Sequence, residues 1–67
     1  MNKKMYRLYD VYDGYSNRVK IGEYDTMDEV RRAALQWDVE ETDGECAFAL
    51  YQLQEDGKYH LQRDFTY

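Results

Sequence analysis

The sequence predicts an α+β fold in which a four-stranded antiparallel sheet carries one helix on one face, in the chain order ββαββ. Three observations lead to this fold class. The stretch 26–41 has the ends and the apolar period of a helix. Residues 5–24 before it and residues 46–67 after it each have the composition and central turn of a hairpin. A chain of 67 residues leaves room for one core, so residues 1–67 are expected to form a single domain.

The predicted helix is defined by its first turn, its apolar stripe and its stop. Thr26 followed by Glu29 is a capping box, in which each side chain can bond a backbone N–H left unpaired at the helix start. Apolar side chains then recur at helical steps of three and four residues: Met27, Val30, Ala33, Ala34 and Trp37. Gly44 can adopt the left-handed conformation common just past a helix end. Leu35 and Val39 lie off the stripe and are expected to be partly exposed.

Residues 5–12 also fit a helical stripe, but their Tyr and Val content and the turn residues at 13–17 favour a strand. With the loop at 13–17, opposite charges and apolar side chains fall opposite each other, and such pairs stabilise sheets. The predicted pairs are Arg7 with Glu23, Asp10 with Lys20, Val11 with Val19, Tyr9 with Ile21, and Tyr6 with Tyr24. We therefore predict a hairpin over 5–24.

Residues 46–67 repeat this arrangement around a tight turn at 55–58, where Gly57 supplies the required positive φ. The intervening helix returns the chain to its starting end, so the third strand runs antiparallel to the first. This connectivity predicts the strand order 2-1-3-4. The segments 6–12 and 46–54, which are apolar on both sides, then lie in the centre, and the charged segments form the edges.

The strand order assigns the apolar side chains to two faces. The set expected beneath the helix is Met5, Tyr9, Val11, Val19, Ile21, Ala47, Ala49, Tyr51, Leu53, Tyr59, Leu61 and Phe65. The other face is expected to expose a cluster with no cover in the chain: Tyr6, Leu8, Tyr24, Phe48 and Leu50, with Tyr12 at its margin. Exposed contiguous apolar patches on small domains usually mark contacts, so this cluster is the predicted protein-binding site. A shifted register, or Tyr rings without a role on a wet sheet, remain as alternatives.

A run of carboxylates surrounds the carboxyl end of the predicted helix, and we call it the acidic run: Asp38, Glu40, Glu41, Asp43 and Glu45. The helix dipole makes negative charge there unfavourable by about 0.3–1 kcal/mol per group. No Lys or Arg lies within the run to compensate. A local rule broken without compensation is typical of a functional surface. Solubility alone can also explain it.

No group of residues in the sequence predicts catalysis, a metal site or a cofactor. His60 is the only histidine, and no nucleophile is placed beside it, which favours a solvated surface side chain. Cys46 is the only cysteine and is expected to be a buried, inert thiol. The spacing of ligand-type residues matches neither zinc nor calcium sites. The four glycines are isolated, so no phosphate-binding loop is predicted.

Composition narrows the class of partner. The formal net charge is −5 and the pI is about 4.6, so phosphate backbones are repelled and direct nucleic-acid binding is disfavoured. An aromatic sheet face is typical of single-strand RNA binders, but those proteins combine it with positive charge. No apolar run is long enough to span a membrane, and a cytoplasmic location is expected.

The function that the sequence predicts is therefore a non-enzymatic interaction module. It would bind a protein partner, or a second copy of itself, through the open sheet face. The alternative is an acidic inhibitor of the kind that phages and mobile elements encode, whose carboxylates imitate nucleic-acid phosphates on a basic host protein.

Overall fold

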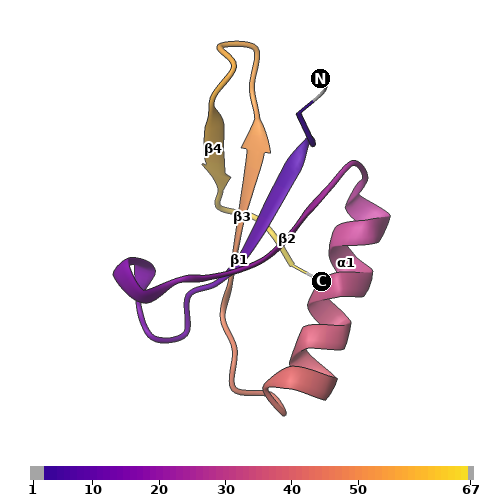
Figure 1. The fold of residues 1–67 in the computed structure, drawn as a ribbon, viewed down its shortest axis with the longest axis vertical. Coiled ribbons are helices and arrows are strands. Elements are labelled where there is room, and N and C mark those ends of the chain that lie inside the picture. The colour runs from indigo at the N-terminus through magenta and orange to yellow at the C-terminus, as the bar shows by residue number, and fades with distance from the viewer. Residues whose placement is uncertain (1–2, 67) are drawn as a thin grey trace.

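The computed structural model describes residues 3–66 and has the predicted fold (Figure 1). Strands β1 (Tyr6–Asp10) and β2 (Val19–Tyr24) are joined by a loop that contains the 3₁₀ turn η1 (Tyr15–Asn17). Helix α1 (Met27–Gln36) continues into a π-helical turn, η2 (Trp37–Glu41). Strands β3 (Phe48–Leu53) and β4 (Tyr59–Gln62) follow. All neighbours in the sheet are antiparallel, and the order β2-β1-β3-β4 confirms the prediction.

The predicted second hairpin is shorter than expected. Strand β4 ends at Gln62, so Phe65 lies in the segment after it rather than in the sheet. Tyr67, the last residue of the predicted range, lies outside the described residues. The β3–β4 turn has the predicted conformation, because Gly57 has a φ of 80°.

The amino end of α1 carries the predicted cap. The backbone N–H of Glu29 donates to Oγ1 of Thr26 at 3.2 Å. The Thr26 hydroxyl in turn donates to the Glu29 carboxylate at 3.1 Å. The reciprocal bond of the box therefore joins the two side chains, whereas the prediction placed it between Glu29 and a backbone N–H.

The carboxyl end of the helix differs from the prediction. The α-helix stops at Gln36, and residues 37–41 form one wider π-helical turn. The backbone N–H of Thr42 donates to the Trp37 carbonyl at 3.0 Å, which closes this turn. Gly44 follows with a φ of 89°, in the left-handed region as predicted. Because π-helical turns are rare and are frequent at functional sites, the widened turn marks this end of the helix as unusual.

Two of the predicted β1–β2 pairs are confirmed: Arg7 lies opposite Glu23, and Tyr6 lies opposite Tyr24. Arg7 Nε donates to the Glu23 carboxylate at 2.9 Å. The part of the hairpin nearest the helix therefore has the expected register.

The other three predicted pairs are wrong: Asp10 with Lys20, Val11 with Val19, and Tyr9 with Ile21. The cause is a β-bulge between Leu8 and Tyr9. Leu8 pairs with Gly22 but Tyr9 pairs with Lys20, so Ile21 is the extra residue on β2. One inserted residue shifts every later pair by one position.

Helix α1 covers the face opposite to the one predicted. The buried core consists of Leu8, Val30, Ala34 and Leu50, none of which exposes more than 2% of its surface. Around it pack Tyr6, Ile21, Tyr24, Met27, Ala33, Phe48 and Phe65. The five residues predicted to form an open patch, Tyr6, Leu8, Tyr24, Phe48 and Leu50, therefore belong to the helix-facing side, and their assignment to the open face was wrong.

The set predicted beneath the helix is mostly elsewhere. Ile21 and Phe65 pack against the core as expected. Met5 and Val19 are 39% and 52% exposed, and Ala47 is also exposed. Strand pairing places the remaining strand residues on the face away from α1: Tyr9, Ala49, Tyr51, Leu53, Tyr59 and Leu61.

Asp10 and Arg7 explain which face is buried. Side chains alternate along β1, so Asp10 shares a face with Leu8, and Arg7 shares the other face with Tyr9. The helix must therefore cover one charged residue. Buried charge is tolerated when it is fully hydrogen-bonded, and Trp37 Nε1 donates to the Asp10 carboxylate at 2.8 Å. A long guanidinium with five N–H groups is harder to satisfy beneath a helix, so the Leu8 side faces inward.

Candidate functional site

The open side of the sheet is the main candidate site, and we call it the tyrosine face. It consists of Tyr9, Tyr51, Tyr59, Leu53 and Leu61 together with the cations Arg7, Arg18 and Lys20. The register brings these residues together: Tyr51 lies between Arg7 on β1 and Leu61 on β4, and Leu53 lies opposite Tyr59. None of them was assigned to an open face from the sequence.

The rings of the tyrosine face are fixed by contacts among themselves and with arginines. Tyr9 and Tyr51 meet edge to face, with ring centroids 5.4 Å apart. The Arg7 guanidinium lies 3.7 Å from the centre of the Tyr59 ring, and that of Arg18 lies 5.4 Å from the centre of the Tyr9 ring. Such cation–π contacts hold both partners in place. The face is therefore a pre-ordered layer of rings and guanidinium groups.

The charge of the tyrosine face is opposite in sign to that of the whole chain. Arg7 and Lys20 both pair with one carboxylate, that of Glu23. These cations, the Lys20 hydrogen bond first, outweigh the effect of burial and lower the pKa of Glu23. Arg18 donates to the Tyr15 carbonyl at 3.0 Å and has no carboxylate partner within residues 3–66. The tyrosine face thus carries three cations and one anion.

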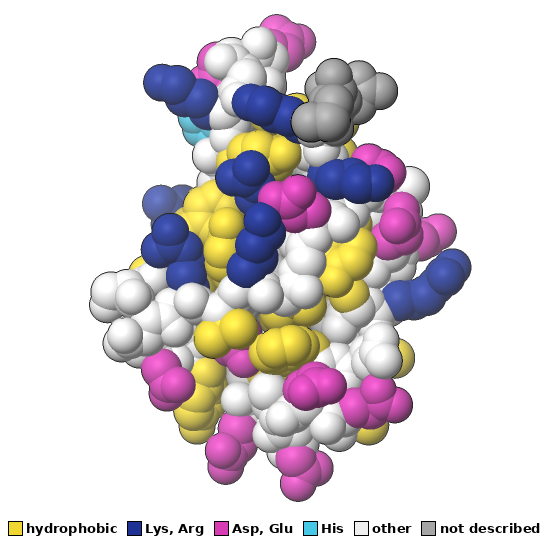
Figure 2. All heavy atoms as spheres, viewed as in Figure 1, with side chains coloured by type: hydrophobic (Ala, Val, Ile, Leu, Met, Phe, Trp, Pro, Cys, Tyr) yellow, Lys and Arg dark blue, Asp and Glu magenta, His cyan; other side chains and the backbone are white. Residues whose placement is uncertain are grey.

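Figure 2 shows this separation of charge. Lys and Arg side chains border a hydrophobic area in the left half of the view, whereas the lower edge carries only Asp and Glu among its charged side chains; further Asp and Glu side chains lie at the top and right. The sequence shows the acidic run but not the cationic group, because Arg7, Arg18 and Lys20 do not form a run along the chain.

The loop between β1 and β2 closes one side of the tyrosine face. Tyr15 of η1 lines a hollow of about 170 Å³ together with Ala49, Leu61 and Arg63. Ala49 is only 3% exposed, although it does not belong to the buried cluster on the helix side. Neighbouring side chains therefore cover this part of the face.

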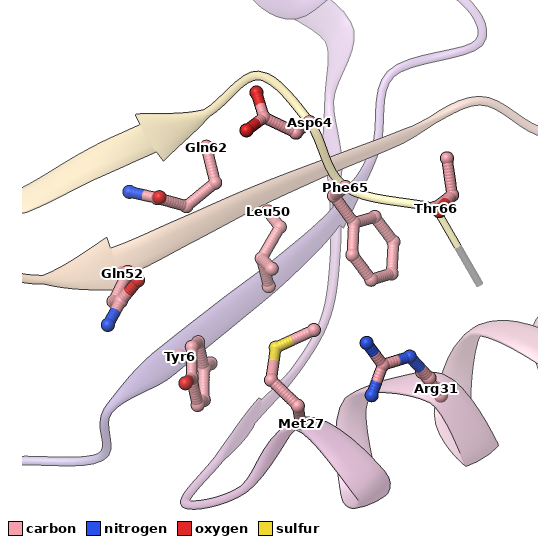
Figure 3. Close-up of a pocket in the computed structure, with 9 residues that line it drawn as sticks. All are labelled: Tyr6, Met27, Arg31, Leu50, Gln52, Gln62, Asp64, Phe65 and Thr66. Carbon is pink, nitrogen blue, oxygen red and sulfur yellow. The ribbon is translucent and has the colours of Figure 1, made fainter.

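A second candidate site is a cavity of about 250 Å³ on the helix side, between α1 and the β3–β4 half of the sheet (Figure 3). Leu50 lies between the strands and Met27 of α1, and Phe65 points in from the segment after β4. Arg31 extends from α1 toward Phe65, and it forms no ion pair within residues 3–66. Tyr6 and Leu50 of the predicted patch line this cavity, but Leu50 is only 2% exposed.

The acidic run lies where the sequence placed it, on η2 and the loop before β3. Glu40, Glu41, Asp43 and Glu45 are exposed, and Asp38 is half-buried. Glu41 and Glu45 line a hollow of about 350 Å³ with residues of the β1–β2 loop. The run therefore forms an accessible acidic end of the molecule.

Asp10 anchors this end to the sheet. Burial alone would raise the pKa of its carboxyl group, but the Trp37 indole N–H and two backbone N–H groups outweigh it and lower the pKa. Those backbone donors are the N–H groups of Tyr12 at 2.9 Å and Ala47 at 3.3 Å. One side chain thus joins the end of β1, the widened turn of the helix and the approach to β3. Sequence reasoning missed this role, because it paired Asp10 with Lys20 across the hairpin.

The remaining reactive side chains do not gather. His60 is exposed, and its Nε2 lies 2.9 Å from the Asp56 carboxylate. Cys46 is half-buried just before β3, and burial raises the pKa of its thiol. Among residues 3–66, no three His, Cys, Asp or Glu side chains are grouped as a metal would need. Within the same range, neither the length nor the apolar content of any helix suffices to cross a bilayer.

Comparisons of the chain with family models, with curated proteins and with solved structures give no match, so the site has to be interpreted from its own residues.

Proposed function

We propose that this protein is a small, non-enzymatic interaction module that binds another protein through the tyrosine face. One observation carries the proposal: a four-stranded sheet has its helix on one side and an ordered layer of Tyr and Arg side chains on the other. Tyr and Arg are enriched in the centres of protein interfaces, where they contribute most of the binding energy.

The geometry of the layer supports this role. Tyr9 and Tyr51 are held by each other, and Tyr59 is held by Arg7 and by a hydrogen bond from its hydroxyl to the Lys4 carbonyl at 2.6 Å. Side chains that are already ordered lose little conformational freedom when a partner binds. Leu53 and Leu61 add apolar area that a partner would remove from water. We also propose a cytoplasmic location, since the lone Cys46 requires no oxidising compartment.

The second candidate function is an acidic inhibitor that imitates nucleic-acid phosphates. The observation that favours it is the exposure of four carboxylates of the acidic run at one end of the molecule. A basic partner would be attracted to this end, and the attraction would fall with ionic strength. The two candidate functions use different surfaces, so one experiment can separate them.

The experiment is photo-cross-linking in the cells that contain the protein naturally. p-Benzoylphenylalanine replaces Leu61 on the tyrosine face, Val39 beside the acidic run, or Leu35 on the outer side of α1. Val39 and Leu35 are 64% and 56% exposed, so neither replacement disturbs the core. We expect a discrete protein adduct from position 61 and none from position 35. An adduct from position 39 alone would favour the inhibitor, and no adduct from position 61 would contradict binding through the tyrosine face.

A further inference from the structure

The charge of the tyrosine face identifies the chemistry of its partner. We infer that the face binds an acidic protein segment that also carries aromatic or aliphatic side chains, and that it does not bind a second copy of this chain. This inference rests on the proposed function and narrows it. It rests on the cations of the face and their unpaired N–H groups, on the free tyrosine hydroxyls, and on the acidic residues in neighbouring loops.

The cations have unused capacity for carboxylates. Arg7 uses Nε for Glu23, at 2.9 Å, and its Cζ lies 3.7 Å from the centre of the Tyr59 ring. Its two terminal nitrogens bond no acceptor within residues 3–66, and such nitrogens can bind a carboxylate with two parallel bonds. Arg18 has no carboxylate partner within residues 3–66, so its charge is also available.

The tyrosines provide the complementary part of the site. The hydroxyl groups of Tyr9 and Tyr51 have no hydrogen-bond partner within the described part of the chain, so both can bond to a ligand. Leu53 and Leu61 lie next to them on the same face. A segment that alternates carboxylates with apolar side chains matches this combination of donors and apolar area.

A second copy of the chain fits this face poorly. In a two-fold symmetric dimer the same surface of each copy meets itself, so both halves of the interface would carry the cations Arg7, Arg18 and Lys20. Like charges placed together across an interface cost several kcal/mol. One carboxylate, Glu23, would have to compensate for all of them, and it is already shared by Arg7 and Lys20.

Single-stranded nucleic acid also fits less well than an acidic protein segment. Arg7 covers the face of the Tyr59 ring, where a base would stack. The strands end in acidic loops: Glu55 and Asp56 lie in the β3–β4 turn, and Asp13 lies in the loop after β1. These carboxylates would repel a phosphate chain that extends along the strands beyond the cationic part of the face.

The test is binding of a fluorescein-labelled random copolymer of glutamate and tyrosine, measured by anisotropy. The face variant is Arg18→Gln with Lys20→Gln, and the matched control is Arg31→Gln with Arg32→Gln. Both variants remove two exposed cations, so they have the same net charge. We expect the face variant to bind about tenfold more weakly than the natural chain, as the loss of two solvent-exposed ion pairs implies, and the control to bind within about twofold of the natural chain.

Several results would overturn the inference. These are absence of copolymer binding, equal weakening in both variants, tighter binding of a labelled thymidine oligonucleotide than of the copolymer, or a dimer in sedimentation that the face variant abolishes. If circular dichroism shows that the double variant is unfolded, the single variant Lys20→Gln replaces it in the binding test. A cross-link from position 61 combined with absent copolymer binding would leave the proposed function standing and remove the acidic partner.

Discussion

The two faces of this sheet have similar apolar content, but their apolar side chains are shielded from water in different ways. On the helix side, aliphatic Leu8 and Leu50 meet Val30 and Ala34 in a dry core, with exposure of at most 2%. On the tyrosine face, rings lie half-buried beneath the stems of Arg7 and Arg18. Long cationic side chains can cover apolar area while their charged ends stay in water. A sheet face can therefore be rich in apolar residues and still be exposed to solvent.

The largest expected difference between the faces is in packing energy. Leu8→Ala should lower the free energy of unfolding by about 2–5 kcal/mol, because it removes fully buried methyl groups and leaves a cavity. In a domain of this size that is a large share of the total stability. Leu53→Ala, on the tyrosine face, is the matched control and should cost less than half as much. Urea unfolding followed by circular dichroism measures both, and equal costs would mean that the faces are not distinct.

The next effect concerns the buried charge that allows the helix side to close. Asp10→Asn should lower the free energy of unfolding by about 1–3 kcal/mol at neutral pH, because an amide cannot accept all the N–H groups that now bond the carboxylate. Asp13→Asn changes the same charge in the exposed loop and should have little effect. Trp37 fluorescence during urea unfolding reports on the site directly.

Acid titration sharpens the Asp10 prediction. Its folded pKa lies below the ordinary value of 3.8, so its contribution is complete above that value and is lost as the pH falls through the folded pKa. Glu23 and Asp56 also have lowered pKa values and contribute to the acid loss in any variant. The difference in stability between the natural chain and Asp10→Asn should therefore shrink below pH 3.8. A difference independent of pH would contradict an ionised Asp10.

A smaller effect is expected from the stacking of Arg7 on Tyr59. A double-mutant cycle with Arg7→Gln and Tyr59→Leu should give a coupling of about 0.5–1 kcal/mol, typical of cation–π pairs near the surface. Adding salt should reduce it only slightly, because the two groups are in direct contact. Zero coupling would mean that the guanidinium moves freely and that the tyrosine face is not pre-ordered.

The smallest expected effect lies outside both faces. Leu35→Gln and Val39→Gln should change the free energy of unfolding by less than about 0.5 kcal/mol, since both residues are more than half exposed. The same urea titrations measure them. A loss above about 1.5 kcal/mol, near the lower range for core truncations, would show that these side chains are packed against other residues and are not exposed to water.

Local features of the sequence predicted much of the fold. Thr26 and Glu29 located the helix start, Gly44 and Gly57 located two backbone reversals, and connectivity led to the strand order. Each of these depends on a few neighbouring residues. Exposure of Leu35 and Val39 also followed from their position off the apolar stripe.

Local features of the sequence could not settle which face of the sheet the helix covers. Both sets of alternating residues in β1 and β3 are mostly apolar, and each contains one charged residue of β1, so the period of two distinguishes the faces without saying which is covered. The bulge at Ile21 shifts the β2 pairs, and the only local sign of it is the adjacent Gly22 inside the strand. For this reason the predicted binding residues were assigned to the wrong face. One clue was present: alternation puts Arg7 beside Tyr9, so burying the tyrosines would also have buried the arginine.

Nuclear Overhauser effects can show directly whether α1 covers Leu8 and leaves the tyrosine face exposed. In a sample with labelled methyl groups, the Val30 methyls should show strong cross-peaks to the methyls of Leu8 and none to the ring protons of Tyr9 or Tyr51. Val30 is fully buried, so its contacts are unambiguous. Cross-peaks from Val30 to those tyrosine rings, without any to Leu8, would contradict the account and return the tyrosines to the core.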